Sequence, residues 1–334
     1  MDIEFHYYMT YLIAAKAGFE SEQAFKLAYS SQYVDNNDKV FEVRDELDES
    51  QYKNYISQTR NILKPQHQLK RIYPLFHFIP GDPEEYSQYL KENCPELNTT
   101  PDSSNANQIM DQALASDNLY QIGIACHAYA DTWAHQNFVG LYDEFNALKD
   151  LVDQILPNIG HLDAEHDPDI PDLIWEDHRL VETEVDNKER FLEAAGRIFT
   201  KFKRYLVAEI SEQVLRLEKE RLLSDLEQII TNADDKEERI KSYNKLALQD
   251  EYGGENVPAY NEYRWFDKAV KEEPPDSLLE EINPLGIIES YTWKDINKYQ
   301  ETHWFKFEEA VKEHQQEATK ILEPVLADKE IENW

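Results

Sequence analysis

The sequence predicts an all-α fold. Apolar residues recur at helical spacing over most of the 334 residues, only 9 residues are glycine, and 12% are aromatic. A chain of this length can bury a sizeable core as one large domain or as two smaller ones. We expect residues 1–180 to form a helical core with a cleft, and residues 181–334 to form a helical extension that packs on the same domain or caps the cleft.

The charge and the cysteine content narrow the classes of function. A formal net charge of −33 disfavours attraction to long nucleic acids or to anionic membrane surfaces, although bound metal cations would reverse the field inside one cleft. Most of the acidic excess fits a solvated surface. The two cysteines, Cys94 and Cys126, form no CxxC motif, which suits a reducing compartment.

The amino-terminal stretch is acidic where a secretory signal is basic, and no apolar run reaches the length of a membrane span. We therefore expect a cytoplasmic protein without a transmembrane segment. Export by a route that needs no amino-terminal signal is compatible with the sequence.

Two helices are predicted at the start of the chain. The first begins near His6 and ends at Gly18, with apolar residues on most of its sides. The second begins at about Glu20 and ends in the polar run 35–38. Asp35 thus lies at a helix end, where it serves either as a cap or as a ligand that reaches another element.

The next seventy residues alternate between polar and apolar stretches. Residues 39–70 are polar and predict a surface excursion, and residues 93–108 predict a polar loop. Between them, His77 is surrounded by Phe and Ile. A histidine in that setting is either a core residue bonded to a backbone carbonyl or a metal ligand.

The helix predicted over residues 107–138 carries the most informative motif, His127-x3-Asp131-x3-His135. Side chains at this spacing project from one helix face, and each step of four advances about 40° beyond a full turn. The three side chains therefore form a curving stripe in which the middle carboxylate can contact two ions. Three residues cannot complete two coordination shells, so further ligands must come from elsewhere in the chain.

A second such pair follows. The run 148–156 predicts a helix, and His161-x3-Glu165 would place an imidazole and a carboxylate on one face of a short helix. The spacing is weak evidence by itself in an acidic chain. It becomes informative after the preceding histidine motif.

The carboxy-terminal half predicts more helices. Residues 183–230 show a sustained helical pattern that fits one long helix or a helical pair, and residues 302–322 form a final amphipathic helix. Loops are expected at Gly253-Gly254 and Pro274-Pro275. His303 and His314 are expected on the surface of the last helix.

The order of these side chains resembles the ligand order of the zinc-dependent phospholipase C and single-strand-specific zinc nuclease superfamily. The stretches that carry the resemblance are HYYMTYLIAAKAGF, YSSQYVD and HAYADTWAHQNFVG, and they look like an intracellular bacterial branch of it. The resemblance covers roughly residues 1–180. It implies a mostly helical phosphodiester hydrolase with two or three zinc ions in one cleft.

Position by position, the resemblance implies three ion sites. One ion would be held by Asp35, His77, His127 and Asp131, the second by His6 and Asp131, and the third by His135, His161 and Glu165. Asp131 would bridge the first two ions. The donor set contains no thiolate, so Mn, Fe and Ni are chemically compatible beside zinc.

Two departures from the family pattern concern individual ligands. Secreted relatives bind metal through the free amine of the mature first residue, whereas this chain begins Met1-Asp2, so Asp2 or Glu4 is expected to substitute beside His6. The spacing from Asp131 to His135 is also shorter than in well-known members. His135 would then turn away from the third site and give its place to His166 or a nearby Asp.

The implied activity is that of a phospholipase C-type phosphoester hydrolase, in which a metal-activated water attacks a phosphodiester. Asp35 would orient this water, and Asp131 would hold the ions. The expected substrate is a phospholipid or a nucleotide, so a nuclease or nucleotide phosphodiesterase is the close alternative. The pair His166-Asp167 allows an HD-type phosphohydrolase, which ignores the stronger motif.

The sequence is also compatible with another class of function and with two interpretations of the aromatic residues near the motif. A non-catalytic metal-binding interaction or effector protein, with a protein partner, is the alternative from another class. The aromatic residues near the motif would form either an apolar substrate wall or ordinary core; they are Tyr129, Trp133, Phe138 and Trp175.

Overall fold

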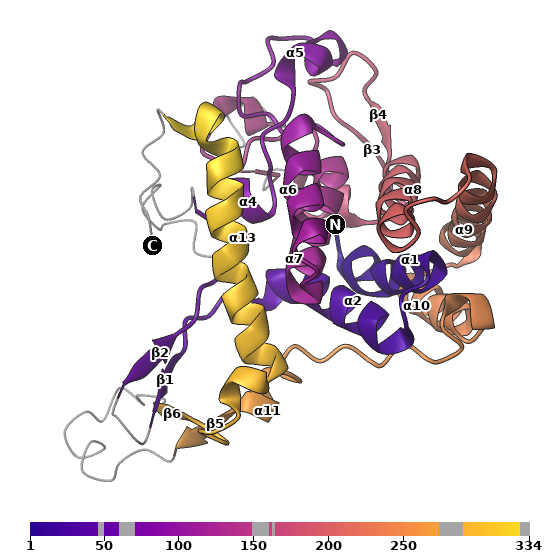
Figure 1. The fold of residues 1–334 in the computed structure, drawn as a ribbon. Helices are drawn as coiled ribbons and strands as arrows, with labels where there is room; N and C mark the ends of the chain where they lie inside the picture. Colours follow the sequence, from indigo (N-terminus) through magenta and orange to yellow (C-terminus); the bar gives the residue numbers. More distant parts are fainter. Residues whose placement is uncertain (46–49, 60–70, 149–159, 162–163, 274–289, 328–334) are drawn as a thin grey trace.

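Helices form most of the structure, a computed structural model that describes residues 1–334 except 46–49, 60–70, 149–159, 162–163, 274–289 and 328–334 (Figure 1). The helices are η1 (Glu4–Met9), α1 (Thr10–Ala17), α2 (Ser21–Asn36), α4 (Tyr73–Phe76), α5 (Pro83–Tyr86), η2 (Ser87–Tyr89), α6 (Ser104–Ala115), α7 (Leu119–Ala134), η3 (Glu144–Asn146), η5 (Asp167–Asp169), α8 (Asn187–Leu206), α9 (Glu212–Asn232), α10 (Lys236–Ala247), η6 (Asp250–Tyr252), α11 (Phe266–Ala269), η7 (Tyr299–Glu301) and α13 (His303–Leu326). The strands are β1 (Glu42–Arg44), β2 (Gln51–Lys53), β3 (Ile174–Glu176), β4 (Glu184–Asp186), β5 (Val270–Glu273) and β6 (Ser290–Trp293). Among the helices of the described ranges, none combines the length and apolar character needed to cross a bilayer.

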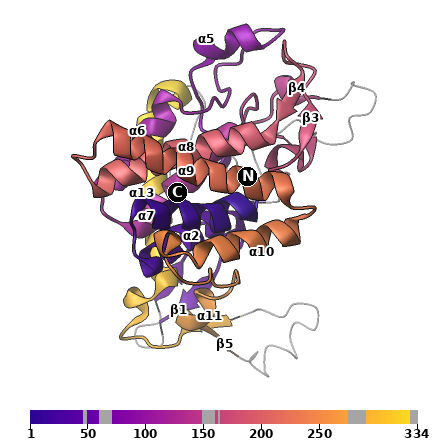
Figure 2. The ribbon, with the colours of Figure 1, turned by 90° about the vertical axis from the view of Figure 1, so that its right-hand side faces the viewer.

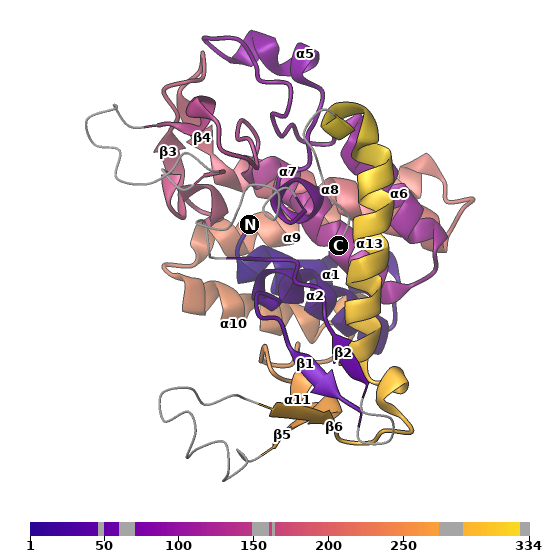
Figure 3. The same cartoon turned by 90° about the vertical axis from the view of Figure 1, so that its left-hand side faces the viewer.

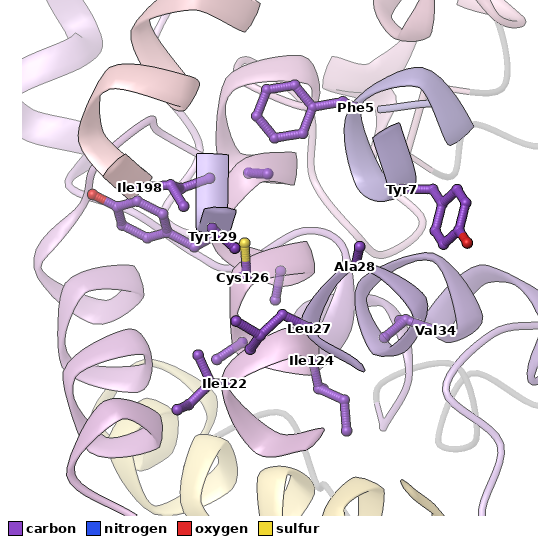
Figure 4. Packing of buried hydrophobic residues seen from close by; sticks show 14 of the residues in the cluster. Phe5, Tyr7, Leu27, Ala28, Val34, Ile122, Ile124, Cys126, Tyr129 and Ile198 are labelled. Atoms are coloured by element: carbon purple, nitrogen blue, oxygen red, sulfur yellow. The ribbon is translucent and has the colours of Figure 1, made fainter. Parts of the chain in front are cut away.

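Helix α7 lies at the centre of the fold. It contacts α2, α6, α8 and α13, and every residue from Ile122 to Ala134 is buried. The Asn118 side chain accepts a hydrogen bond from the Tyr120 N–H and caps the amino-terminal end of the helix. Figure 4 shows side chains of η1, α2, α7 and α8 meeting in this core, among them Phe5 and Ile198. His127 and Asp131 are therefore buried because they lie on the central helix of the fold.

The carboxy-terminal helices complete the same core. Helix α8 contributes Phe191, Ile198 and Phe202 to the cluster that also contains α7, and α13 contributes Phe307 and Val311. Figure 2 shows α8, α9 and α10 crossing beside α1 and α2, and Figures 1 and 3 show α13 running along α6 and α7. The described helices of residues 181–334 thus pack on the amino-terminal helices.

The chain starts in the interior. The amino terminus lies inside the outline of the molecule in views taken at right angles (Figures 1 and 2), and Met1 is only 5% exposed. The six residues of η1 are all buried, and they follow a π-helical turn rather than an α-helical one. Turns of this kind are frequent at functional sites because they re-aim side chains within a helix.

The all-α prediction was too strict, because the structure also contains two small sheets. A four-stranded mixed sheet has the order β2-β1-β6-β5, with β1 parallel to β6, and β3 and β4 form a hairpin. The predicted surface excursion over residues 39–70 contributes β1 and β2, and Val43 in it is fully buried. Strands of three or four residues are too short to show a period of two, and β1 pairs with residues about 250 positions away.

The helix predicted over residues 107–138 is two helices. Helix α6 already begins at Ser104, where Ser103 accepts the Ala106 N–H, and a turn with Asp117 at φ 55° separates it from α7. The predicted polar loop over 93–108 is correspondingly shorter. Helix α7 ends at Ala134, so His135 is the residue that follows the helix rather than part of it.

Other boundaries confirm the sequence prediction. The first helical segment ends at Gly18, whose φ of 117° is left-handed, and α2 ends at Asn36. The pattern over 183–230 is a helical pair with Ser211 capping the second member, and Thr302 caps α13. The predicted helix 148–156, apart from Leu148, and the Pro274-Pro275 loop lie outside the described residues.

The prediction of surface histidines in α13 was wrong for His314. His314 is 4% exposed, and its Nε2–H donates to the Leu75 carbonyl at 2.9 Å. His303 is half-buried and stacks on Trp265 at 5.2 Å between ring centroids. The face of α13 that looked polar in the sequence packs against α4 and α7, which only tertiary contacts reveal.

The crossing of α2 and α7 depends on a glycine of α7. A Cβ at Gly123 would lie 2.5 Å from Ser30 Cβ and 2.7 Å from the Leu27 carbonyl oxygen. We expect Gly123→Ala to lower the free energy of unfolding by about 1–3 kcal/mol, because backbone atoms cannot move aside. The measurement is denaturant unfolding of the purified variant.

A glycine in another helix provides the matched control for this prediction. At Gly196 a Cβ would meet only flexible side-chain ends, at 3.4 Å or more. Gly196→Ala should therefore leave stability unchanged or raise it by about 0.5–1 kcal/mol through helix propensity. Equal loss of stability in both variants would contradict the assigned crossing of α2 and α7.

Candidate metal centre

Nine groups from distant parts of the chain lie together at the carboxy-terminal end of α7, and the carboxylate of Asp131 is at their centre. They are Met1, His6 of η1, Asp35 of α2, His77 after α4, His127 and Asp131 of α7, His135 after α7, His161, and Asp169 of η5. We call this set the Asp131 centre. Helix ends and helix-flanking residues supply several of its members, which lets side chains from different elements point at one place.

Asp131 contacts other members of the centre with both of its oxygens. Its Oδ1 lies 2.6 Å from the Met1 amine and 3.0 Å from His6 Nε2. Its Oδ2 lies 3.2 Å from His127 Nε2 and 3.3 Å from His77 Nδ1. The two oxygens of the carboxylate thus face different neighbours, which is the arrangement that a ligand shared by two ions would need.

The members other than Met1 form three groups, each with three potential donor atoms within 4.8 Å of one another. The groups are His6–His127–Asp131, Asp35–His77–His127, and His135–His161–Asp169. Donor atoms of a tetrahedral ion with bonds of about 2.1 Å are about 3.4 Å apart. The spacings here, such as 3.7 Å from Asp35 Oδ1 to His127 Nε2, are close to that value.

Backbone carbonyls orient three of the imidazole rings. His77 Nε2–H donates to Ser57 O at 2.9 Å, and His135 Nδ1–H donates to His77 O at 2.8 Å. His161 Nδ1–H donates to Glu165 O at 2.8 Å. Because a carbonyl only accepts, the other ring nitrogen carries the lone pair, and in each ring it faces the centre. This arrangement is typical of histidines that bind metal.

The charges within the centre suit a cation. Burial lowers the pKa of His6 and of His161 to about 4, so both rings are neutral near pH 7. Burial alone would raise the pKa values of Asp131 and Asp169, but nearby positive charge, including the Met1 amine, outweighs burial and holds both well below their usual range. Ionised carboxylates and neutral imidazoles are the forms in which these groups bind metal.

The Met1 amine shows that the centre accommodates positive charge. It lies 2.6 Å from Asp131 and 3.1 Å from Asp169. Burial acts to lower the pKa of this amine, but the carboxylates of Asp131, Asp169 and Asp35 outweigh burial and raise it to about 11. A nitrogen in this place contacts two of the three donor groups.

Buried polar atoms without a hydrogen-bond partner also indicate whether a cation fits the Asp131 centre. His6 Nε2 and Asp169 Oδ1 are buried without a hydrogen-bond partner in the part of the chain that the structure describes. His6 Nε2 is 3.0 Å from Asp131 but outside hydrogen-bond geometry. Buried polar atoms are nearly always satisfied, so this concentration at one place needs an explanation. Divalent cations fit the donor atoms, their spacing and their charge.

Seven of the eight metal ligands predicted from the sequence meet in the centre, namely His6, Asp35, His77, His127, Asp131, His135 and His161. Glu165 does not: it is exposed, its φ is 53°, and its backbone carbonyl accepts a hydrogen bond from His161 Nδ1. The expected short helix is absent from the described part of 161–165, because left-handed residues at 160 and 165 break it. Asp169 takes the place that Glu165 was expected to fill.

The expected replacements at the amino terminus and at His135 are also absent from the described residues. Asp2 accepts from Lys236 at 2.6 Å, and Glu4 pairs with Arg239, so neither faces the centre. His135 stays in the third group, 3.6 Å from Asp169, whereas His166 is exposed.

Sequence reasoning missed two members. At the amino terminus, Asp2 or Glu4 was expected as a ligand in place of the Met1 nitrogen. Asp169 was covered only by the expectation of an unspecified Asp near His166. The signal for Asp169 was its place in the Asp-Pro-Asp-Ile-Pro run, which cannot continue a helix. The four predicted wall aromatics are at most 7% exposed, which favours the core interpretation; they are Tyr129, Trp133, Phe138 and Trp175.

Comparison with known proteins identifies one matching family. A family model described as a family of unknown function (DUF6765) matches residues 1–322. No curated protein and no solved structure is significantly similar to the chain.

Proposed function

We propose that this chain, which belongs to the family of unknown function DUF6765, is a metal-dependent phosphoester hydrolase of the phospholipase C type, because of the geometry of the Asp131 centre. The observation that carries the proposal is the convergence of three donor groups around the carboxylate of Asp131, whose two oxygens face different imidazoles. Structural sites need one closed set of four ligands, whereas adjoining sets of three with open positions are typical of catalysis.

The residues that would hold the ions follow from the groups. Asp35, His77 and His127 would hold one ion together with Asp131 Oδ2, His6 and Asp131 Oδ1 a second, and His135, His161 and Asp169 a third. Imidazole and carboxylate donors without thiolate suit zinc, and they also accept Mn, Fe or Ni. We place zinc first because of the resemblance described above.

The roles of the two central aspartates differ with their exposure. When bound, divalent ions supply charge that stabilises phosphate oxygens and lowers the pKa of water. Asp35 has a side chain that is 28% exposed and lies beside His77 and His127, so it can accept the proton of an attacking water and orient that water. Asp131 is 1% exposed and serves to hold the ions.

The substrate class follows from charge more than from shape. A net charge of −33 disfavours long polyanions, so we propose a phospholipid or a nucleotide as substrate. The donor set does not distinguish a phospholipase from a nucleotide phosphodiesterase, and a panel of both substrate types separates them. A metal-binding interaction protein would hold the same ions without turnover.

The proposal predicts the outcome of replacing Asp35. Zinc-loaded wild-type protein is expected to hydrolyse bis(p-nitrophenyl) phosphate, and Asp35→Asn is expected to lower kcat by about 10²–10⁴-fold because the proton acceptor is lost. The measurement is steady-state release of p-nitrophenol, with bound zinc quantified in the same samples.

Asp38→Asn provides the control, because Asp38 is an exposed carboxylate outside the three donor groups. It is expected to retain wild-type kcat. Equal turnover by wild type and Asp35→Asn would contradict the role of Asp35. Bound zinc without turnover of any phosphoester in the panel would favour the interaction protein.

A further inference from the structure

A buried arginine of α10 connects two segments of the Asp131 centre. Arg239 is 4% exposed, and its Nε and Nη2 donate to the two carboxylate oxygens of Glu4 at 2.8 and 3.0 Å. Its Nη1 donates to Asp172 Oδ2 at 2.7 Å. Glu4 is fully buried, so the paired guanidinium is its main compensation for lost hydration. One planar group thereby holds two carboxylates from distant parts of the chain.

Each of the two carboxylates is close in sequence to a member of the centre. Glu4 lies two residues before His6 in η1, and Asp172 lies three residues after Asp169. Two or three residues span at most about 7–10 Å, so fixing the carboxylate strongly limits where the neighbouring donor can lie. His6 and Asp169 belong to different donor groups. Arg239 therefore connects a segment that carries a donor of one group with a segment that carries a donor of another group.

A lysine on the same helix acts on the same segment. Lys236 lies three residues before Arg239, and its Nζ donates to Asp2 Oδ2 at 2.6 Å. Asp2 Oδ1 in turn accepts the backbone N–H of Glu4 at 2.8 Å. Helix α10 therefore presents two cations to the stretch between Met1 and His6, and its packing against η1 is direct.

We propose that Arg239 is a positioning residue of the metal centre, which fixes η1 and the 169–172 segment at the separation that lets His6 and Asp169 bind neighbouring ions. This inference rests on the proposed function. It also assigns a role to the carboxy-terminal helices: α10 holds the amino-terminal donors in place. The group Asp35–His77–His127 comes from α2, α7 and the end of α4, and none of its three residues contacts Arg239 in the described structure.

The experiment compares zinc binding by wild type, Arg239→Met and Arg179→Met. Arg179 is the matched control, because it pairs with the buried Asp177 but touches no member of the centre. In calorimetric titrations with zinc chloride, Arg239→Met is expected to keep one tight ion, at Asp35–His77–His127, and to bind the others about 10–100-fold more weakly. Arg179→Met is expected to bind all ions as wild type does, and Arg239→Lys to lie between.

Asp172→Asn sharpens the test and guards against unfolding of the arginine variant. Asp172 is 38% exposed and touches only one arm of Arg239, so its loss should weaken only the ion at His135–His161–Asp169. Hydrogen exchange of chelated protein provides a readout without metal: residues 4–9 and 170–173 should exchange faster in Arg239→Met than in Arg179→Met.

The outcomes separate the two proposals. Zinc bound equally by wild type, Arg239→Met and Asp172→Asn would overturn the positioning role and leave the metal centre intact. Uniform weakening of all ions in Arg179→Met as well would also overturn it, since a general loss of stability would then explain the result. Absence of bound zinc from wild type would overturn the proposed function, and the positioning role with it.

Discussion

Asp131→Asn is expected to lower the affinity of the centre for zinc by more than about 100-fold and to abolish turnover. Groups that only support metal ligands contribute about 10–100-fold in affinity, so loss of a bridging ligand should exceed that range. Asparagine keeps the size of the side chain but removes the negative charge between the Met1 amine and the imidazoles of His6, His77 and His127. Its amide nitrogen would also face those groups as a donor.

Elemental mass spectrometry of untagged protein, purified without chelator, measures this effect. Asp177→Asn is the matched control, because Asp177 is equally buried and ion-paired, with Arg179, but lies outside the centre. The control should lose stability and keep its metal. Full zinc content in Asp131→Asn, or equal loss in both variants, would contradict the bridging role of Asp131.

Removal of the metals is expected to lower the thermal midpoint of unfolding by about 10 °C. A ligand present at 1,000 times its dissociation constant stabilises the folded state by about 4 kcal/mol per site. Two occupied sites therefore contribute about 8 kcal/mol. The unfolding entropy of a chain of 334 residues is about 0.7 kcal/mol/K, which converts this energy to roughly 11 °C.

Calorimetric scans of zinc-loaded and chelator-treated protein test this prediction. Zinc should restore the midpoint after the chelator is removed, and magnesium should not, because it prefers oxygen donors over the imidazoles that dominate the centre. Asp131→Asn should show a much smaller response to chelator. Identical midpoints with and without chelator in wild type would show that the centre contributes no metal-linked stability.

The helical part of the fold was predictable because its signals are local. Gly18 ends the first helical segment, and Ser211 and Thr302 cap α9 and α13 in the way their residue types favour. The sheets were not predictable, because their strands are short and Val43 pairs not only with nearby Tyr52 but also with Tyr291, which is distant in sequence. The burial of His314 likewise depends on a contact with Leu75, 239 positions away.

The candidate site was predictable where ligands lie on regular helix and not where the backbone departs from it. His127 and Asp131 are four residues apart on α7 and share a face as expected. Glu165 follows the same spacing in sequence, but a left-handed backbone turns it outward, and Asp169 enters in its place. No spacing rule could have placed the Met1 nitrogen, because its position depends on η1 and on the cations of α10.

A zinc-edge anomalous difference map from crystals of zinc-loaded protein tests the central claim most directly. We expect two or three peaks, each within about 2.0–2.2 Å of donor atoms of one group, with Asp131 next to more than one of them. Crystals that contain zinc in solution but show no peak beside Asp131 would contradict the metal centre and the hydrolase built on it.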